Sequence, residues 1–258
     1  MGIGSVAEES DPSDPTALAA LRPLAESSIE IAVSATTRLT HREIYTSRGL
    51  LTLLVHEPAH ELTPELTPEL TPELNGVTAP GAAIVAGGGA MGGLLGPGHG
   101  LYHHLGETWA ARGVRFVRVG YREPNNLDLC AHDLACGVET ARDAGSQRVV
   151  LMGHSFGGAA AIRAAVVMTA SVVGVVTFAT QSAGCEVAGA LHGRPLLLFH
   201  GDRDELLPAE ASYMVQAIAG SGEVVILPGD GHLLGRSDDA IIERLDEWLP
   251  TVLAPKPG

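Results

Sequence analysis

From residue 82 onward the sequence alternates between short apolar runs and longer stretches with helical spacing, and this alternation restricts the fold more than any other feature. Strands that alternate with helices predict right-handed βαβ units, and therefore an α/β fold with a predominantly parallel sheet and helices on both faces. The strands are expected at 82–86, 114–119, 148–152, 172–178, 195–199 and 224–227, and the helices at 99–112, 127–144, 156–169, 208–219 and 238–248.

The residues before this alternation follow other patterns. Residues 29–36 alternate apolar and small polar side chains and residues 50–56 are apolar, which predicts an antiparallel N-terminal strand pair. Glu-Leu-Thr-Pro then recurs within 61–74, and proline at every fourth position predicts an exposed connecting loop, because proline blocks both helix and strand ladder. We expect residues 1–28 to be a mobile acidic tail with a short helix over 16–21, and 29–258 to be the functional domain.

Size, composition and charge limit the possible classes of protein. The 258 residues suit one α/β domain, and 45% hydrophobic residues with 32 glycines fit a buried parallel sheet with many tight turns. The formal net charge of −14 argues against binding to nucleic acid or to an anionic membrane surface, because both require a basic face. The oligomeric state leaves no sign in the sequence.

The compartment is inferred from what the sequence does not contain. No leader-like segment opens it, and no apolar stretch approaches the roughly 18 residues of a membrane span. Cys130, Cys136 and Cys185 lack metal-ligand spacing, so we expect free thiols in a reducing compartment. A cytoplasmic protein is the prediction.

Residues 153–157 read Gly-His-Ser-Phe-Gly between a predicted strand and a helix rich in small residues. This pattern predicts a serine on a sharp, strained strand-to-helix turn, where the two glycines let strand and helix approach each other. A serine hydroxyl becomes a nucleophile when a base takes its proton, and that base works best when a buried acid orients it. Acidic and histidine candidates follow two later strands, in the segments 200–204 (His-Gly-Asp-Arg-Asp) and 229–232 (Gly-Asp-Gly-His).

The elbow Gly-His-Ser-Phe-Gly-Gly, the His-Gly-x-x-Asp segment with its following Leu-Pro, and the Gly-x-Gly-His segment resemble motifs of the α/β-hydrolase superfamily. The resemblance extends over about residues 29–249, and the order serine, acid, histidine is that of the superfamily. It implies that Ser155 is the nucleophile, Asp204 the orienting acid and His232 the base, with Asp202 as a competitor of Asp204. We expect neither a cofactor nor a metal ion.

The oxyanion of an acyl-transfer intermediate needs N–H donors that already point at it. One expected donor is the amide of Phe156, directly after the nucleophile, and the other lies in the glycine loop 87–93. Superfamily members usually begin this loop with His-Gly, whereas this chain has Ala-Gly at 86–87. Aligning the two glycines makes Gly88 the expected donor and Gly89 the next choice.

Two other motifs match signatures of different protein classes. The glycines at 87, 89 and 92 satisfy a dinucleotide-binding fingerprint, but further glycines and a proline interrupt the helix that must follow at once. His56-Glu57-Pro58-Ala59-His60 reads as a zinc-protease signature, which works only on a helix, whereas a strand-like run precedes it and Pro58 would break the helix. Neither nucleotide nor zinc is expected.

The segment 180–194 is too short for a lid domain, so we expect an open site with Gln181, Ser182 and Cys185 near its rim. The expected activity is hydrolysis of acyl esters of small or open-lying substrates through an acyl-enzyme. A thioesterase or acyltransferase with the same three residues is an alternative, and so is a non-catalytic binding protein with a degenerate hydrolase fold, because fold does not fix function.

Overall fold

The structure is a computed structural model and describes residues 23–58 and 81–255. Within these residues one nine-stranded sheet has the strand order β1-β2-β3-β5-β4-β6-β7-β8-β9. The predicted helix at 16–21 and the predicted repeat loop at 61–74 lie outside the described residues. The helices of the described part include none that is long and apolar enough to cross a membrane.

The larger part of the sheet is parallel. Its strands are β4 (Ala82–Gly87), β5 (Arg115–Gly120), β6 (Arg148–His154), β7 (Val172–Phe178), β8 (Leu196–Gly201) and β9 (Glu223–Leu227). The N-terminal part is antiparallel and consists of β1 (Ala25–Val33), β2 (Thr37–Thr46) and β3 (Gly49–Pro58), of which β3 pairs with β5. The predicted fold class is confirmed.

The N-terminal element has one strand more than expected. β2 lies between β1 and β3, so the two strands that were predicted to pair with each other both pair with β2 instead. β2 is only half-buried along most of its length, and a strand with both faces partly in water needs no alternating apolar set. Its polar sequence therefore gave no strand signal. β1 also begins earlier than predicted, at Ala25.

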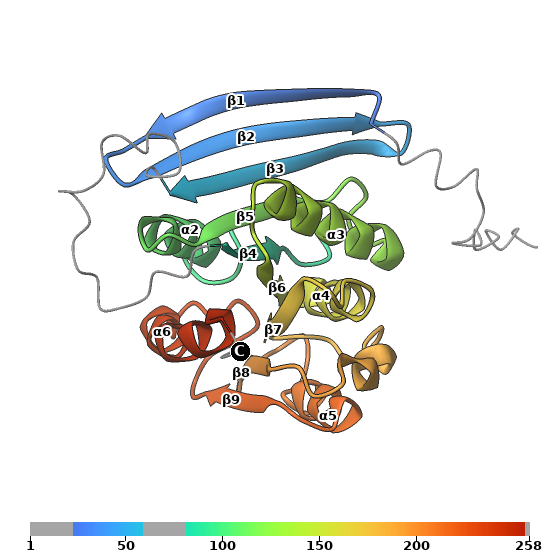
Figure 1. The fold of residues 1–258 in the computed structure, drawn as a ribbon. Coiled ribbons are helices and arrows are strands. Elements are labelled where there is room, and N and C mark those ends of the chain that lie inside the picture. Colours follow the sequence, from blue (N-terminus) through green and yellow to red (C-terminus); the bar gives the residue numbers. More distant parts are fainter. Residues whose placement is uncertain (1–22, 59–80, 256–258) are drawn as a thin grey trace, which may run out of the picture.

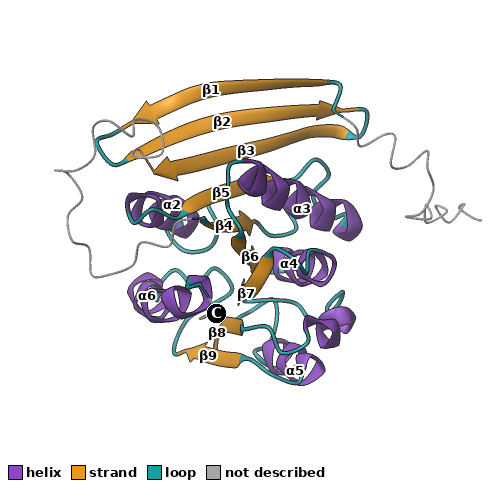
Figure 2. Ribbon diagram, in the orientation of Figure 1, coloured by secondary structure: helices purple, strands orange, loops and turns teal. Residues whose placement is uncertain are grey.

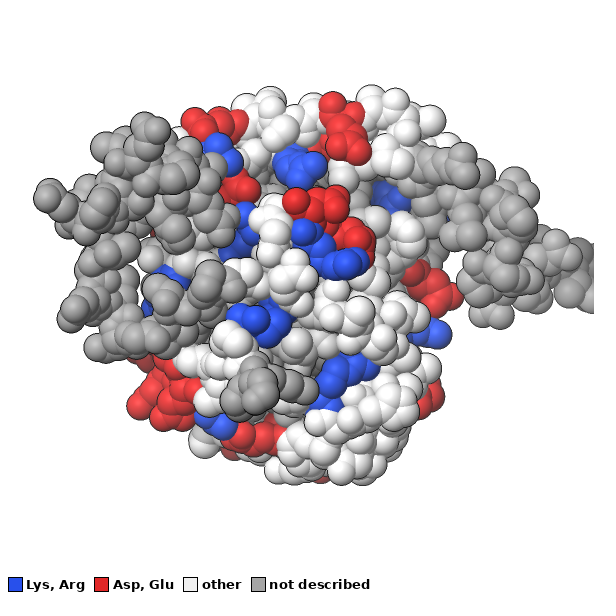
Figure 3. All heavy atoms as spheres, viewed as in Figure 1, with Lys and Arg blue, Asp and Glu red and all other residues white. Residues whose placement is uncertain are grey.

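Charged side chains of opposite sign face each other across the exposed strands β1 and β2. Arg38 lies 3.8 Å from Glu30, and Arg42 lies 3.9 Å from Glu26. Figure 3 shows basic and acidic side chains interspersed over this end of the molecule, without a large basic patch on the visible face. Exposed pairs of this kind contribute little to stability but keep the sheet edge polar.

Helices cover both faces of the parallel strands (Figures 1 and 2). On one face lie α2 (Leu101–Ala111) and α6 (Asp238–Leu253), and on the other lie α3 (Leu127–Asp143), α4 (Phe156–Val167), α5 (Glu210–Ala219) and the 3-10 helix η3 (Glu186–Leu191). Successive residues of β6 point to opposite faces, so Val149 and Leu151 join one buried cluster while Val150 and Met152 join the other. Burial on both faces explains why these strands read as continuous apolar runs.

The loops that leave the carboxyl ends of the parallel strands meet at one edge of the sheet, where ligands bind in such folds. Between β7 and β8 the only helix in the described chain is η3, so the described residues form no lid domain over this edge. The predicted candidate residues all lie in these loops or beside them.

Candidate active site

Ser155 lies in the turn between β6 and α4, with φ 56° and ψ −120°. A positive φ at a residue other than glycine is strained, and such strain persists only where the surroundings enforce it. Here the Ser155 amide donates to the carbonyl of Phe178 at 2.8 Å. A Cβ on Gly153 would collide with the backbone of Gly157, and a Cβ on Gly157 would collide with the carbonyl of Gly88. These close approaches account for both glycines of the pentad.

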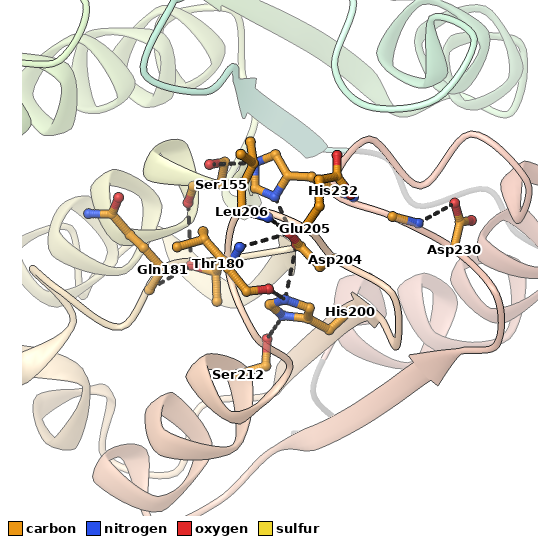
Figure 4. Close-up of polar contacts among 12 residues, drawn as sticks. Ser155, Thr180, Gln181, His200, Asp204, Glu205, Leu206, Ser212, Asp230 and His232 are labelled. Atoms are coloured by element: carbon orange, nitrogen blue, oxygen red, sulfur yellow. Dashed lines mark hydrogen bonds and ion pairs between the residues drawn. The ribbon is translucent and has the colours of Figure 1, made fainter.

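The structure brings Ser155, His232 and Asp204 into one hydrogen-bonded row (Figure 4). Nε2 of His232 lies 2.9 Å from Oγ of Ser155, and Nδ1 of His232 lies 2.8 Å from Oδ2 of Asp204. The carboxylate can only accept, so Nδ1 carries the proton and Nε2 is free to accept the serine proton. The Asp204 side chain is fully buried and that of His232 is 7% exposed.

The carboxylate of Asp204 is surrounded by donors. Its Oδ1 accepts hydrogen bonds from the amides of Leu206 and Leu207, both at 2.8 Å. Burial acts to raise the pKa of Asp204, but the hydrogen bonds from Leu207, His232 and Leu206 outweigh it and hold the pKa below its ordinary value. Asp204 is therefore an anion that can orient His232 near neutral pH.

Asp202, the competing candidate, lies elsewhere. Its Oδ1 accepts a hydrogen bond from the amide of Gly229 at 2.6 Å, which ties the loop after β8 to the loop after β9. Asp230 is buried and accepts from the amides of Gly231 and Arg236 within its own loop. Of the three aspartates in these loops, Asp204 is the one whose carboxylate contacts His232.

Three polar groups around the row were not identified from the sequence. His200 is fully buried, and its Nε2 lies 3.2 Å from Oδ2 of Asp204. His154 places Nε2 3.0 Å from the carbonyl oxygen of His232, and Glu205 accepts a hydrogen bond from the His232 amide at 3.3 Å. His154 and His200 belong to the sequence motifs around Ser155 and Asp204, but only the folded structure shows which groups they contact.

The expected oxyanion donors border the serine. Phe156 is the first residue of α4, so its N–H has no partner within the helix. A Cβ on Gly89 would lie 3.6 Å from Cβ of Ser155, and the carbonyl of Gly88 packs against Gly157. Both loop glycines thus lie at the elbow, and the donor register between them stays a prediction.

The zinc-protease signature and the dinucleotide-binding fingerprint both lie in backbone structures that do not suit the sites they would form. His56 and Pro58 are part of the extended strand β3, which cannot place histidines as a helix does, while His60 lies outside the described residues. The glycine fingerprint is not followed directly by a helix, because α2 begins only at Leu101. Neither site has the geometry that its signature requires.

A mostly parallel sheet with a serine elbow after β6, an acid after β8 and a histidine after β9 defines the α/β-hydrolase fold. This chain has that fold, as its motifs predicted. No protein-family model matches the sequence, and no curated protein matches it significantly.

Solved structures from several sources have the same fold. Est1E from Butyrivibrio proteoclasticus is 16% identical with a TM-score of 0.63, and the match covers 88% of this chain and 99% of that one. A dienelactone hydrolase from Anabaena variabilis is 17% identical with a TM-score of 0.62, over 89% and 99%. A cold-adapted esterase from an Arctic intertidal metagenomic library is 10% identical with a TM-score of 0.66, over 88% and 98%.

Proposed function

We propose that the protein is a serine hydrolase that cleaves acyl esters of small or open-lying substrates through an acyl-enzyme. The observation that carries the proposal is the continuous row from Ser155 through His232 to the buried carboxylate of Asp204, with a strained serine at its head. A strained backbone that presents a hydroxyl to an oriented imidazole is typical of a nucleophile.

In the proposed reaction Oγ of Ser155 attacks the ester carbonyl while Nε2 of His232 takes the hydroxyl proton. Asp204 stabilises the imidazolium that forms. The amide of Phe156, with that of Gly88 or Gly89, binds the oxyanion. The tetrahedral intermediate then collapses, the C–O bond to the alcohol breaks, and His232 gives its proton to the leaving oxygen. Water, activated by His232, hydrolyses the acyl-serine in the same way.

The similar structures support an ester or related substrate. Their names are those of esterases and hydrolases, and Est1E has also been solved with ferulic acid bound. The absence of a lid over the described site fits a small or open-lying molecule. The alternative of a thioesterase or acyltransferase differs only in the group that leaves or enters, and a binding protein would lack turnover altogether.

The proposed compartment is the cytoplasm. Cys130, Cys136 and Cys185 are free thiols, and burial raises the pKa of Cys130 and of Cys185 to about 12. Such thiols are poorly reactive, which suits a structural role in a reducing environment.

The test is labelling with a fluorophosphonate together with turnover of p-nitrophenyl esters and acyl thioesters. We expect labelling of Ser155, and faster cleavage of oxygen esters than of thioesters with the same acyl chain. Faster thioester cleavage would favour the thioesterase. A folded protein that neither reacts with the fluorophosphonate nor cleaves any ester would be a binding protein.

A further inference from the structure

A hollow of about 310 Å³ lies beside the candidate active site. Leu207, Pro208, Ala211 and Met214 form one wall, and Gln181 and Ala183 belong to the other. The first wall comes from the loop after β8 and the start of α5, and the second from the loop after β7. The lining is mainly apolar, as in sites that bind small organic groups.

Two hydrogen bonds connect these walls to the reacting residues. Thr180, which precedes Gln181, places Oγ1 3.4 Å from the carbonyl oxygen of Ser155. The amide of Leu207 donates to Oδ1 of Asp204 at 2.8 Å. Each wall therefore begins at, or one residue after, a residue that contacts Ser155 or Asp204, which places the hollow next to these two residues.

The base reaches the serine from the opposite face of the sheet. Leu234, in the same loop as His232, packs in the cluster under α2 and α6, whereas Val215 of α5 belongs to the cluster on the other face. Figure 4 shows Gln181 and His232 on opposite sides of Ser155. The leaving alcohol must meet the proton on Nε2 of His232, so it departs on that side, which leaves the side of the hollow open to the acyl group.

We propose that the hollow binds the acyl group of the substrate and selects an uncharged, apolar one, an inference that rests on the proposed ester hydrolysis. Its lining includes Glu210 and neither Lys nor Arg, so nothing there compensates a second carboxylate on the acyl group. The volume is at the lower end of the range of about 300–1,000 Å³ for ligand sites. A chain of moderate length or a single aromatic ring fits it better than a long fatty chain.

The first measurement is kcat/KM for p-nitrophenyl esters of graded acyl length. We expect a rise of up to about fourfold for each methylene that enters the hollow, followed by a plateau when it is full. A monoester whose acyl chain ends in a carboxylate should react much more slowly than a neutral ester of equal length. A flat profile, or a preference for the charged chain, would overturn the acyl site.

A matched pair of variants tests whether the wall that contains Met214 determines the selectivity for the acyl group. Met214 is 54% exposed and lines the hollow, while its neighbour Tyr213 is 47% exposed and does not. Met214→Glu should lower the octanoyl-to-acetyl ratio of kcat/KM at least tenfold, and Tyr213→Glu should leave the ratio within twofold. Equal changes in both variants would contradict the assignment. If the melting curve shows that the charged variant is not folded, Met214→Gln is used in its place.

A second ester series varies the alcohol at a fixed acyl group. If Met214→Glu changes the dependence on alcohol length and not on acyl length, the hollow binds the alcohol and our inference is wrong. A wild-type protein that cleaves no ester at all would overturn the proposed function itself. A wild type that cleaves esters without discriminating acyl length would overturn only the role of the hollow.

Discussion

Nε2 of His200 lies 3.2 Å from Oδ2 of Asp204, the same oxygen that accepts a hydrogen bond from His232. The carbonyl oxygen of Leu207 is 3.1 Å from this Nε2, so both neighbours can only accept and Nε2 carries the proton. The hydroxyl of Ser212 on α5 lies 2.7 Å from Nδ1 and can donate to it. One carboxylate oxygen is thus held between two imidazoles, and Ser212 of α5 supplies a donor to the unprotonated Nδ1 of His200.

We therefore expect His200→Gln to reduce kcat more than it raises KM, because Asp204 loses a neighbour that holds it in place. The buried acceptor left behind should cost about 1–3 kcal/mol of folding free energy. Ser212→Ala should also lower kcat, but by less than His200→Gln does. His56→Gln is the control, since His56 is also buried but packs against α2 and Phe116, away from the serine. Comparable loss of kcat in the control would mean that the effect is only one of stability.

Ser155→Ala should abolish ester cleavage, with a fall of about 10⁴–10⁶-fold in turnover, and leave the fold intact. The hydroxyl contacts His232 and contributes nothing to the apolar core. His232→Ala should cost about as much, and the double variant little more, because residues that act as a unit are not additive. Turnover and melting temperature of the purified variants check this, and near-normal activity of Ser155→Ala would refute the mechanism.

Asp204→Asn should lower turnover by about 10⁴-fold, because an amide at this position favours the wrong tautomer of His232. Asp202→Asn should have a far smaller effect, since Asp202 binds the Gly229 amide and does not touch the imidazole. Steady-state kinetics of the two variants decide the matter. The reverse order of effects would assign the orienting role to the other aspartate.

Stability should fall as the pH falls from about 6.5 to 4. Burial lowers the pKa of His154 to about 4, so within this interval the unfolded chain binds a proton that the folded chain excludes. His154 should account for a loss of about 3 kcal/mol between pH 7 and pH 4. Asp204, with its pKa below the ordinary 3.8, adds a loss only in more acidic solution.

Denaturant unfolding at pH 7, 5.5 and 4 measures this slope. His154→Gln should make it shallower, because an amide does not titrate but can still donate to the carbonyl of His232. Burial also lowers the pKa of His56, to about 3, so His56→Gln should remove a further part of the slope. Identical slopes in wild type and both variants would contradict this origin of the acid sensitivity.

The sequence predicted best what lies in the middle of the sheet. β4 and β6 are buried on both faces and cannot be mistaken for surface segments, and the serine elbow needs glycines at fixed positions. β2 was not predicted because its side chains are mostly polar and only half-buried. The roles of Ser155, Asp204 and His232 stay predictions, although the structure brings the three together.

Other parts of the site depend on how distant segments pack. The contact between His200 and Ser212 requires that α5 lies against the loop after β8, and the contact between His154 and the His232 carbonyl joins residues far apart in the sequence. No local pattern specifies either contact. Whether Gly88 or Gly89 is the second oxyanion donor depends on the exact path of the loop, and glycine residues restrict that path very little.

Asp204 and His232 lie in the loops that follow β8 and β9, the last two strands of the sheet, and β9 has β8 as its one strand neighbour in the described chain. β9 is short, partly exposed, and leads into the His232 loop. Regions with few buried contacts open locally before the whole domain unfolds. Fraying of this edge would separate His232 from Ser155 while the interior strands stay paired, so catalytic competence should disappear at a lower denaturant concentration than helical circular dichroism.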